Sequence, residues 1–96
     1  MESHSENYKV SVCVPAFVGR GLRSTIRVGI WYCHPGSPIR YGQRLVELAV
    51  GSMNVTVHAP CDGRLIECLC PEDTMIAADA ILGVIRTYGH GSTSES

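Results

Sequence analysis

The sequence has 96 residues, enough for one small domain and too few for two. Hydrophobic residues make up 45% of it and occur as short runs of Val, Ile and Leu separated by glycine and proline, which favours an all-β domain over a helical bundle. A formal net charge of −1 argues against binding to nucleic acid or to a membrane surface through bulk electrostatics.

Both ends of the chain are polar and poor in aliphatic residues, so residues 1–8 and 88–96 are predicted to be flexible tails on one domain at 9–87. The sequence contains neither a signal peptide nor an apolar run long enough to span a bilayer, and we expect a cytoplasmic protein. Five cysteines without a secretory signal do not indicate a disulfide framework.

The first part of the predicted domain alternates apolar and polar residues in two stretches. Lys9–Pro15 is a predicted strand whose three valines face inward. Residues 16–24 form a predicted loop, in which two glycines supply backbone freedom. The next predicted strand covers Thr25–Cys33, with Ile26, Val28 and Ile30 facing inward and Arg27 outward.

A hairpin is predicted in the middle of the sequence. Arg44–Val50 and Val55–Pro60 alternate as its two strands, and the uncharged residues Gly51–Asn54 form its tip. After a tight turn, further strands are predicted at Arg64–Cys70 and Ala80–Thr87.

A weak internal repeat relates the two halves of the predicted domain. A shift of 37 residues aligns aliphatic positions and turn positions, namely Ile39 with Ile76, Leu45 with Leu82, Leu48 with Ile85, Gly36 with Asp73 and Gly42 with Asp79. Aspartate tolerates tight turns and left-handed conformations, so both aspartates suit these places. Since neither half can bury its apolar face alone, the repeat predicts a flattened barrel or sandwich with a pseudo-two-fold axis.

Four motifs follow one another along the chain: Val14-Pro15 with Gly19 and Gly21, Trp31 with Pro35-Gly36, Gly42-Gln43-x-Leu45 leading into Val46-Glu47-Leu48, and Ala59-Pro60-x-x-Gly63. In this order the segment from Val10 to Ile85 resembles the lipoyl/biotinyl carrier domains, and in particular the lipoyl domains of 2-oxo acid dehydrogenase complexes. The resemblance implies a barrel-sandwich hybrid of two four-stranded antiparallel sheets. It also implies a lysine at a hairpin tip, where a covalent lipoate or biotin would serve as a mobile arm.

Counting back from Ala59-Pro60 places the attachment lysine of the family on Ser52. Gly51 occupies a position that is usually acidic or polar in lipoyl domains, and Met53 matches the methionine that follows the lysine in biotinyl domains. A hydroxyl cannot form the amide that joins these cofactors to lysine, so Ser52 is predicted to be unmodified and no cofactor is expected. The only lysine of the sequence is Lys9, at the start of the first predicted strand.

The resemblance without the lysine implies a non-modified interaction or scaffold module for a multienzyme complex of the acyl-transfer or carboxylase type. Its expected partner is a protein, such as a subunit of that complex, and the isolated domain is expected to be a monomer. The alternative is a genuine lipoyl or biotin carrier that is modified at Lys9 or another unexpected residue. A resemblance to efflux adaptor barrels is weaker, because those proteins carry long helical insertions at the hairpin.

Other chemistries find little support in the sequence. Ser52 lacks the helix start on which phosphopantetheine carriers place their serine, and a turn residue with local hydrogen bonds is the expectation. Cys33-His34 and Cys68-x-Cys70 do not have the usual metal-site spacing, and their cysteines are predicted to be small buried hydrophobes. No catalytic group is expected, because adjacent strand residues such as Cys33 and His34 face opposite ways. Trp31 is predicted to lie in the core or to pack as a half-exposed ring rather than to serve as a ligand platform, and His58 is predicted to be exposed near the tip.

Overall fold

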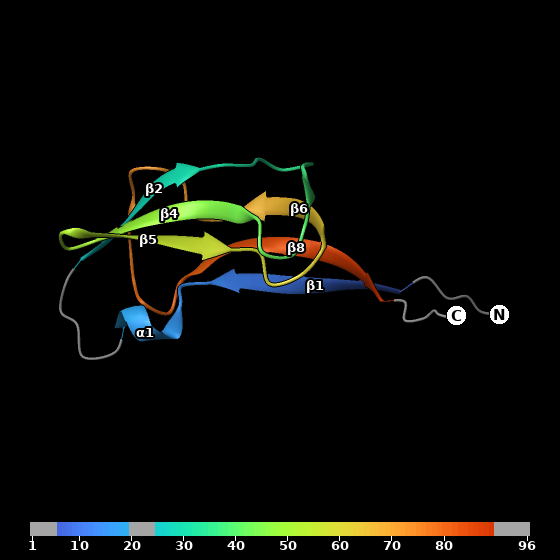
Figure 1. Cartoon of the computed structure of the whole chain (residues 1–96), viewed down its shortest axis with the longest axis horizontal. Helices are drawn as coiled ribbons and strands as arrows, with labels where there is room; N and C mark the ends of the chain where they lie inside the picture. Colours follow the sequence, from blue (N-terminus) through green and yellow to red (C-terminus); the bar gives the residue numbers. More distant parts are fainter. Residues whose placement is uncertain (1–5, 20–24, 90–96) are drawn as a thin grey trace.

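The computed structural model describes residues 6–19 and 25–89 (Figure 1). These residues form eight strands and one helical turn. In chain order the elements are β1 (Glu6–Cys13), α1 (Ala16–Gly19), β2 (Ile26–Trp31), β3 (Pro38–Ile39), β4 (Arg44–Val50), β5 (Met53–His58), β6 (Gly63–Cys68), β7 (Met75–Ile76) and β8 (Ile81–Gly89). No helix in the described part of the chain has the length and apolar character of a membrane span.

The strands make two sheets of four, and all of the paired strands run antiparallel. The first, which we call the β1 sheet, has the order β1-β8-β6-β3, and the second, the β5 sheet, has the order β5-β4-β2-β7. Each sheet is open at its edges. This architecture confirms the prediction of an all-β, lipoyl-like sandwich of two four-stranded antiparallel sheets.

The core contains only apolar side chains and one thiol among the described residues. Both sheets contribute, because alternate residues of each strand point into the space between them. The largest fully buried side chains are Leu45, Leu48, Leu65, Leu82, Ile85, Val12, Val28 and Val46. The predicted inward faces of the first strand and of the hairpin therefore supply much of the core.

The predicted repeat is present in the architecture. Three strands of the first half, β2, β3 and β4, begin at residues 26, 38 and 44, and their counterparts β6, β7 and β8 begin at 63, 75 and 81, each 37 residues later. Exchanging these partners, together with β1 and β5, converts the strand order of one sheet into that of the other. The two halves thus interlock, and each sheet contains strands from both.

Backbone hydrogen bonds repeat with the same shift. Gly36 N donates to Leu65 O at 2.7 Å, and the equivalent Asp73 N donates to Val28 O at 2.8 Å. A second matched pair joins Leu65 N to Ser37 O at 3.0 Å and Val28 N to Thr74 O at 2.9 Å. The bonds tie each half to the other, so the pseudo-symmetry extends to the details of the main chain.

The turn residues follow the repeat in one case and depart from it in the other. Gly36 and Asp73 both have positive φ, at 98° and 66°, which confirms that aspartate adopts a left-handed conformation here. Gly42 has φ of 83°, as a type II turn requires, whereas Asp79 does not have positive φ. The turn at Asp79 has nevertheless kept the same closing bond, from Ala80 N to Ala77 O.

The strand ends and the first loop differ from the sequence expectation. β1 begins at Glu6 and β8 ends at Gly89, and these two residues pair, so strand structure extends into the segments expected to be tails. Part of the expected loop at 16–24 is α1, whose single turn starts after Pro15 and is held by a 3.0 Å bond from Val18 N to Pro15 O. Residues 20–24 lie outside the described part of the chain.

The prediction that Ile30 faces the core is wrong. Its side chain is 55% exposed, while Ile26 and Val28 are buried as expected. The register between β2 and β4 shifts between Val28 and Trp31, and such a bulge breaks the two-residue alternation. As a result Ile30 points to solvent and Trp31 turns toward the interior.

Candidate functional site

The first candidate site is the turn that joins β4 to β5 (Figure 1, left). Val50 pairs with Met53, so Gly51 and Ser52 alone form the loop. Gly51 has φ of 59° and Ser52 does not have positive φ, the combination of a type II′ hairpin turn. The predicted tip therefore divides: Gly51 and Ser52 are the turn, and Met53 and Asn54 are the first residues of β5. All four are exposed.

No amine lies in this turn, and the chain's lysine is in the other sheet. Lys9 is inside β1, where it pairs with Arg86 of β8. It is therefore in the middle of a strand, not at its start as the sequence suggested. The residues of the turn do not fit a covalently attached lipoate or biotin, since the amide that holds these groups requires a primary amine.

Ser52 forms no hydrogen bond through its hydroxyl to any described residue. The expectation that it serves local hydrogen bonding is therefore wrong. Its backbone conformation, exposure and position after Gly51 account for its place in the turn. A longer side chain at this exposed position would therefore remove no side-chain hydrogen bond to a described residue.

His58 and the cysteines differ in part from expectation. His58 is exposed as predicted, but it pairs with Arg44 at the base of the hairpin, so the prediction that it lies near the tip is wrong. Cys33 is buried, whereas Cys68 and Cys70 are only half-buried. No group of three or more His, Cys, Asp or Glu side chains in residues 6–19 and 25–89 could hold a metal ion.

Burial keeps the half-buried and buried thiols protonated near neutral pH. It raises the pKa of Cys33, Cys61 and Cys70, and in Cys61 a neighbouring carboxylate, Asp62, adds to the rise while a hydrogen bond with Thr87 opposes it. The pKa of Cys68 is raised by burial first and by the proximity of Cys33 second. Since the thiolate is the nucleophile and the metal ligand, these groups act as apolar packing residues.

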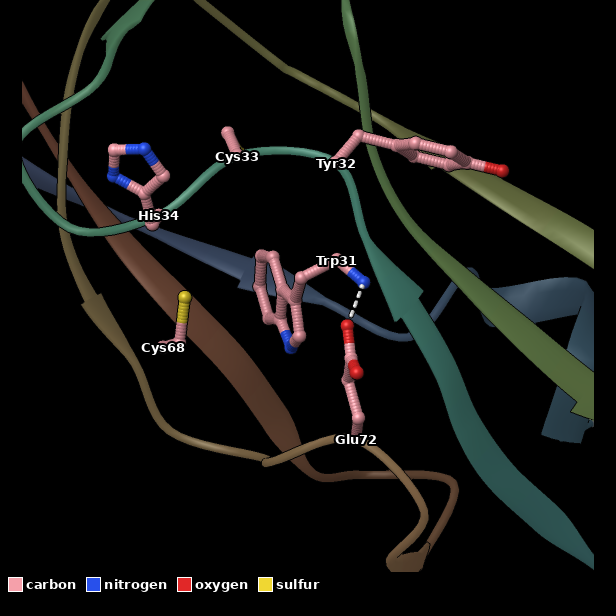
Figure 2. Close-up of a pocket in the computed structure, with 6 residues that line it drawn as sticks. All are labelled: Trp31, Tyr32, Cys33, His34, Cys68 and Glu72. Carbon is pink, nitrogen blue, oxygen red and sulfur yellow. Dashed lines mark hydrogen bonds between the residues drawn. The ribbon is translucent and has the colours of Figure 1, made fainter.

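The second candidate site is a pocket of about 340 Å³ between the ends of β2 and β6. Its lining residues come from both halves of the chain: Trp31, Tyr32, Cys33, His34, Cys68 and Glu72. Figure 2 shows the indole ring of Trp31 between Cys68 and Glu72, with His34 above the Cys68 thiol. Tyr32 points away along the surface, where its ring lies 4.8 Å from the guanidinium carbon of Arg44.

Trp31 is fixed at both its backbone and its ring. Its backbone N donates to Oε2 of Glu72 at 2.9 Å, and its indole Nε1 donates to the carbonyl oxygen of Cys70 at 2.8 Å. Both acceptors belong to the segment that follows β6, so the ring bridges the two halves. The prediction that Trp31 packs half-buried is confirmed.

The small size of Gly83 makes room for this ring. A Cβ atom at Gly83 would lie 3.2 Å from Cη2 of Trp31 and 2.7 Å from the carbonyl oxygen of Glu67. Gly83 pairs with Cys68 in the β1 sheet, and Trp31 pairs with Val46 in the β5 sheet. Trp31 thus belongs to the β5 sheet, and its ring packs against the small residues Cys68 and Gly83 of the β1 sheet.

Glu72 and the pocket as a whole were missed by sequence reasoning. The 37-residue shift aligns Trp31 with Cys68, and residues related by a two-fold axis meet where they lie close to it. This signal was available from the repeat, although it does not specify that Glu72 would face the indole.

The sequence model of one protein family, described as "Biotin-requiring enzyme" (Biotin_lipoyl), matches residues 10–85. The match covers most of the chain and has the same limits as the resemblance found in the motifs. No curated protein matches the sequence.

Proposed function

The chain belongs to the biotin/lipoyl domain family, and from this premise we propose that it is a member that carries no cofactor and acts as an interaction or scaffold module. Domains of this family are carriers and not catalysts, and they work by contact with the subunits of enzyme complexes. The proposed partner is accordingly a protein subunit of a multienzyme complex of the acyl-transfer or carboxylase type.

One observation carries the proposal: the turn that would hold the attachment lysine consists of Gly51 and Ser52, while the chain's lysine lies inside β1. A carrier arm must sweep between active sites, and it does so from a projecting turn. Lys9, in the middle of β1 and paired with Arg86 of β8, does not offer that position.

The fold itself is fully retained, which supports a role in recognition. Both sheets, the symmetric backbone bonds and the two-residue turn are present. A preformed surface binds a partner with little ordering cost, so a module without the arm can still dock where a carrier domain docks.

The mass of the protein tests the proposal directly. Protein isolated from its native host is expected to have the mass of the unmodified chain. A mass increased by one lipoyl or biotinyl group would contradict the proposal and establish the alternative, a carrier that is modified at an unexpected residue.

A gain-of-function variant tests the assignment of Ser52. Ser52→Lys is expected to fold, because Ser52 is exposed and has an ordinary φ, and to accept lipoate or biotin from the corresponding ligase. Ser52→Arg is the matched control, since it adds the charge without an amine that can be acylated. Gly51 stays unchanged, so that Ser52 is the one position altered in the turn. A folded Ser52→Lys protein that stays unmodified would contradict the placement of Ser52 at the attachment position.

A further inference from the structure

The pocket between β2 and β6 combines an aromatic wall with one carboxylate. Trp31 forms the wall. Its indole Nε1 donates to the carbonyl oxygen of Cys70 and its backbone N donates to Glu72, so the residue is already ordered before anything binds. Glu72 stands beside the ring and uses Oε2 to accept the Trp31 backbone N–H. The carboxylate therefore has a fixed position with its second oxygen not used by any described residue.

The electrostatics of the pocket favour a positive guest. Among its lining residues Glu72 is the one carboxylate, and neither arginine nor lysine is present. Asp73, the next residue, adds a second exposed carboxylate to the same turn. The thiols of Cys33 and Cys68 are kept neutral by burial and provide an apolar floor.

We propose that this pocket binds the side chain of an arginine or lysine from a partner protein. The aliphatic stem of such a side chain would pack on Trp31 and the two thiols, and its cationic head would lie against the indole face and the Glu72 carboxylate. Arginine fits best, because a planar guanidinium both stacks on an aromatic ring and pairs with a carboxylate. The inference rests on the proposed function, for which it names the contact surface and the chemistry of the partner.

The same chemistry already occurs inside the chain. The guanidinium of Arg44 lies over the ring of Tyr32, the neighbour of Trp31, at 4.8 Å. Trp31 is the better cation acceptor of the two ring types, yet no described cation lies over it. The pocket beside Trp31 thus offers an equivalent contact that a residue from outside the chain can fill.

Trp31 is the single tryptophan of the protein, so its fluorescence and its indole N–H resonance report on the pocket without labelling. The probes are n-butylguanidinium and n-butylammonium, with n-butanol and butyrate as neutral and anionic compounds of matched shape, all titrated at the same pH and ionic strength. The two cations are expected to shift the Trp31 signals at lower concentration than butanol, and butyrate to bind weakest.

Glu72→Gln is the decisive variant, because the amide oxygen of glutamine can still accept the Trp31 N–H while the charge is lost. It should weaken butylguanidinium binding about threefold and leave butanol unaffected. Glu67→Gln is the matched control, because it removes the same charge from an exposed residue that does not line the pocket. Its affinity for butylguanidinium should equal that of the wild type.

Two results would overturn the inference: butanol binding as tightly as the cations, or equal affinities for butylguanidinium in wild type and the Glu72→Gln variant. Neither result bears on the absence of a cofactor, which the intact mass decides. Conversely, a lipoyl or biotinyl adduct on the native protein would end the proposed function and leave the affinity of the pocket for cations unchanged.

Discussion

The two halves of the chain place different side chains on equivalent strand pairs. In the β5 sheet Trp31 pairs with Val46, and in the β1 sheet the equivalent pair is Cys68 with Gly83. One pair has two large residues and the other has two small ones. The indole ring of Trp31 fills the space that the small pair leaves. The four side chains together therefore fill the interior, although the two pairs differ in size.

This difference shows where a repeated fold can acquire a specific site. The backbone bonds keep the symmetry because every strand needs its partners in both halves. Side chains near the axis cannot keep it, since two indole rings would occupy the same space. The resulting asymmetry creates the pocket beside Trp31, whereas the turn at Gly51 and Ser52 has retained only its backbone geometry.

Removing the Trp31 ring should have the greatest effect on the free energy of unfolding. Trp31→Ala eliminates a half-buried ring and the hydrogen bond from its indole Nε1 to the carbonyl oxygen of Cys70, and should lower the free energy of unfolding by about 3 kcal/mol. Cys68→Ala, at the equivalent position, should cost about 1 kcal/mol or less. Urea denaturation followed by far-UV circular dichroism measures both. Equal losses would show that the ring contributes no more than the thiol to which it corresponds.

Enlarging the small pair should have the next largest effect. Gly83→Ala places a Cβ close to Glu67 O and to the Trp31 ring, and should lower the free energy of unfolding by about 2 kcal/mol. Part of this loss should disappear when Trp31→Leu is combined with Gly83→Ala, and a double-mutant cycle quantifies that part. Strict additivity would mean that the ring does not restrict Gly83.

Exchanging the turn residues tests the symmetry of the backbone. Gly36→Asp should lower the free energy of unfolding by about 1 kcal/mol, because φ is 98° there, although a Cβ would have open space around it. Asp73→Gly should raise it by about 0.5 kcal/mol, since relief of the left-handed backbone exceeds the entropy that glycine adds to the unfolded chain. Thermal denaturation of both variants is the measurement. A loss in Asp73→Gly would show that the aspartate side chain stabilises its turn.

The smallest expected change in stability concerns cross-strand charge pairs, which differ between equivalent positions of the two sheets. Cross-strand pairing aligns Lys9, Arg86 and Arg64 in the β1 sheet, and Asn54, Ala49 and Arg27 in the β5 sheet. Like charges directly opposite one another destabilise a sheet. Lys9→Glu should therefore raise the free energy of unfolding by about 0.5 kcal/mol, and 1 M salt should abolish the gain.

The matched control for that variant is Asn54→Glu, which introduces the same residue opposite Ala49 and should leave stability unchanged. Chemical denaturation at low and high salt separates the charge effect from strand propensity. A gain for Lys9→Glu that persists at high salt would rule out relief of charge repulsion as its cause.

Much of the architecture could be predicted from the sequence, because the 37-residue repeat and the alternating valines of β1 carry long-range information in a local pattern. The register shift in β2 could not, since no residue type between Val28 and Trp31 specifies a bulge, and Ile30 was assigned to the wrong face as a result. The pocket could not be predicted either. It depends on a turn carboxylate reaching the backbone of a residue 41 positions away.

The pairing of Glu6 with Gly89 brings the two ends of the described sheet together at the pole opposite the Gly51–Ser52 turn (Figure 1). If the unit were inserted into a longer polypeptide, the chain would enter and leave it at neighbouring points. Splicing the unit into a surface loop of another enzyme would require almost no separation between the two junctions. In such a fusion the Gly51–Ser52 turn would lie at the end of the unit farthest from the host protein.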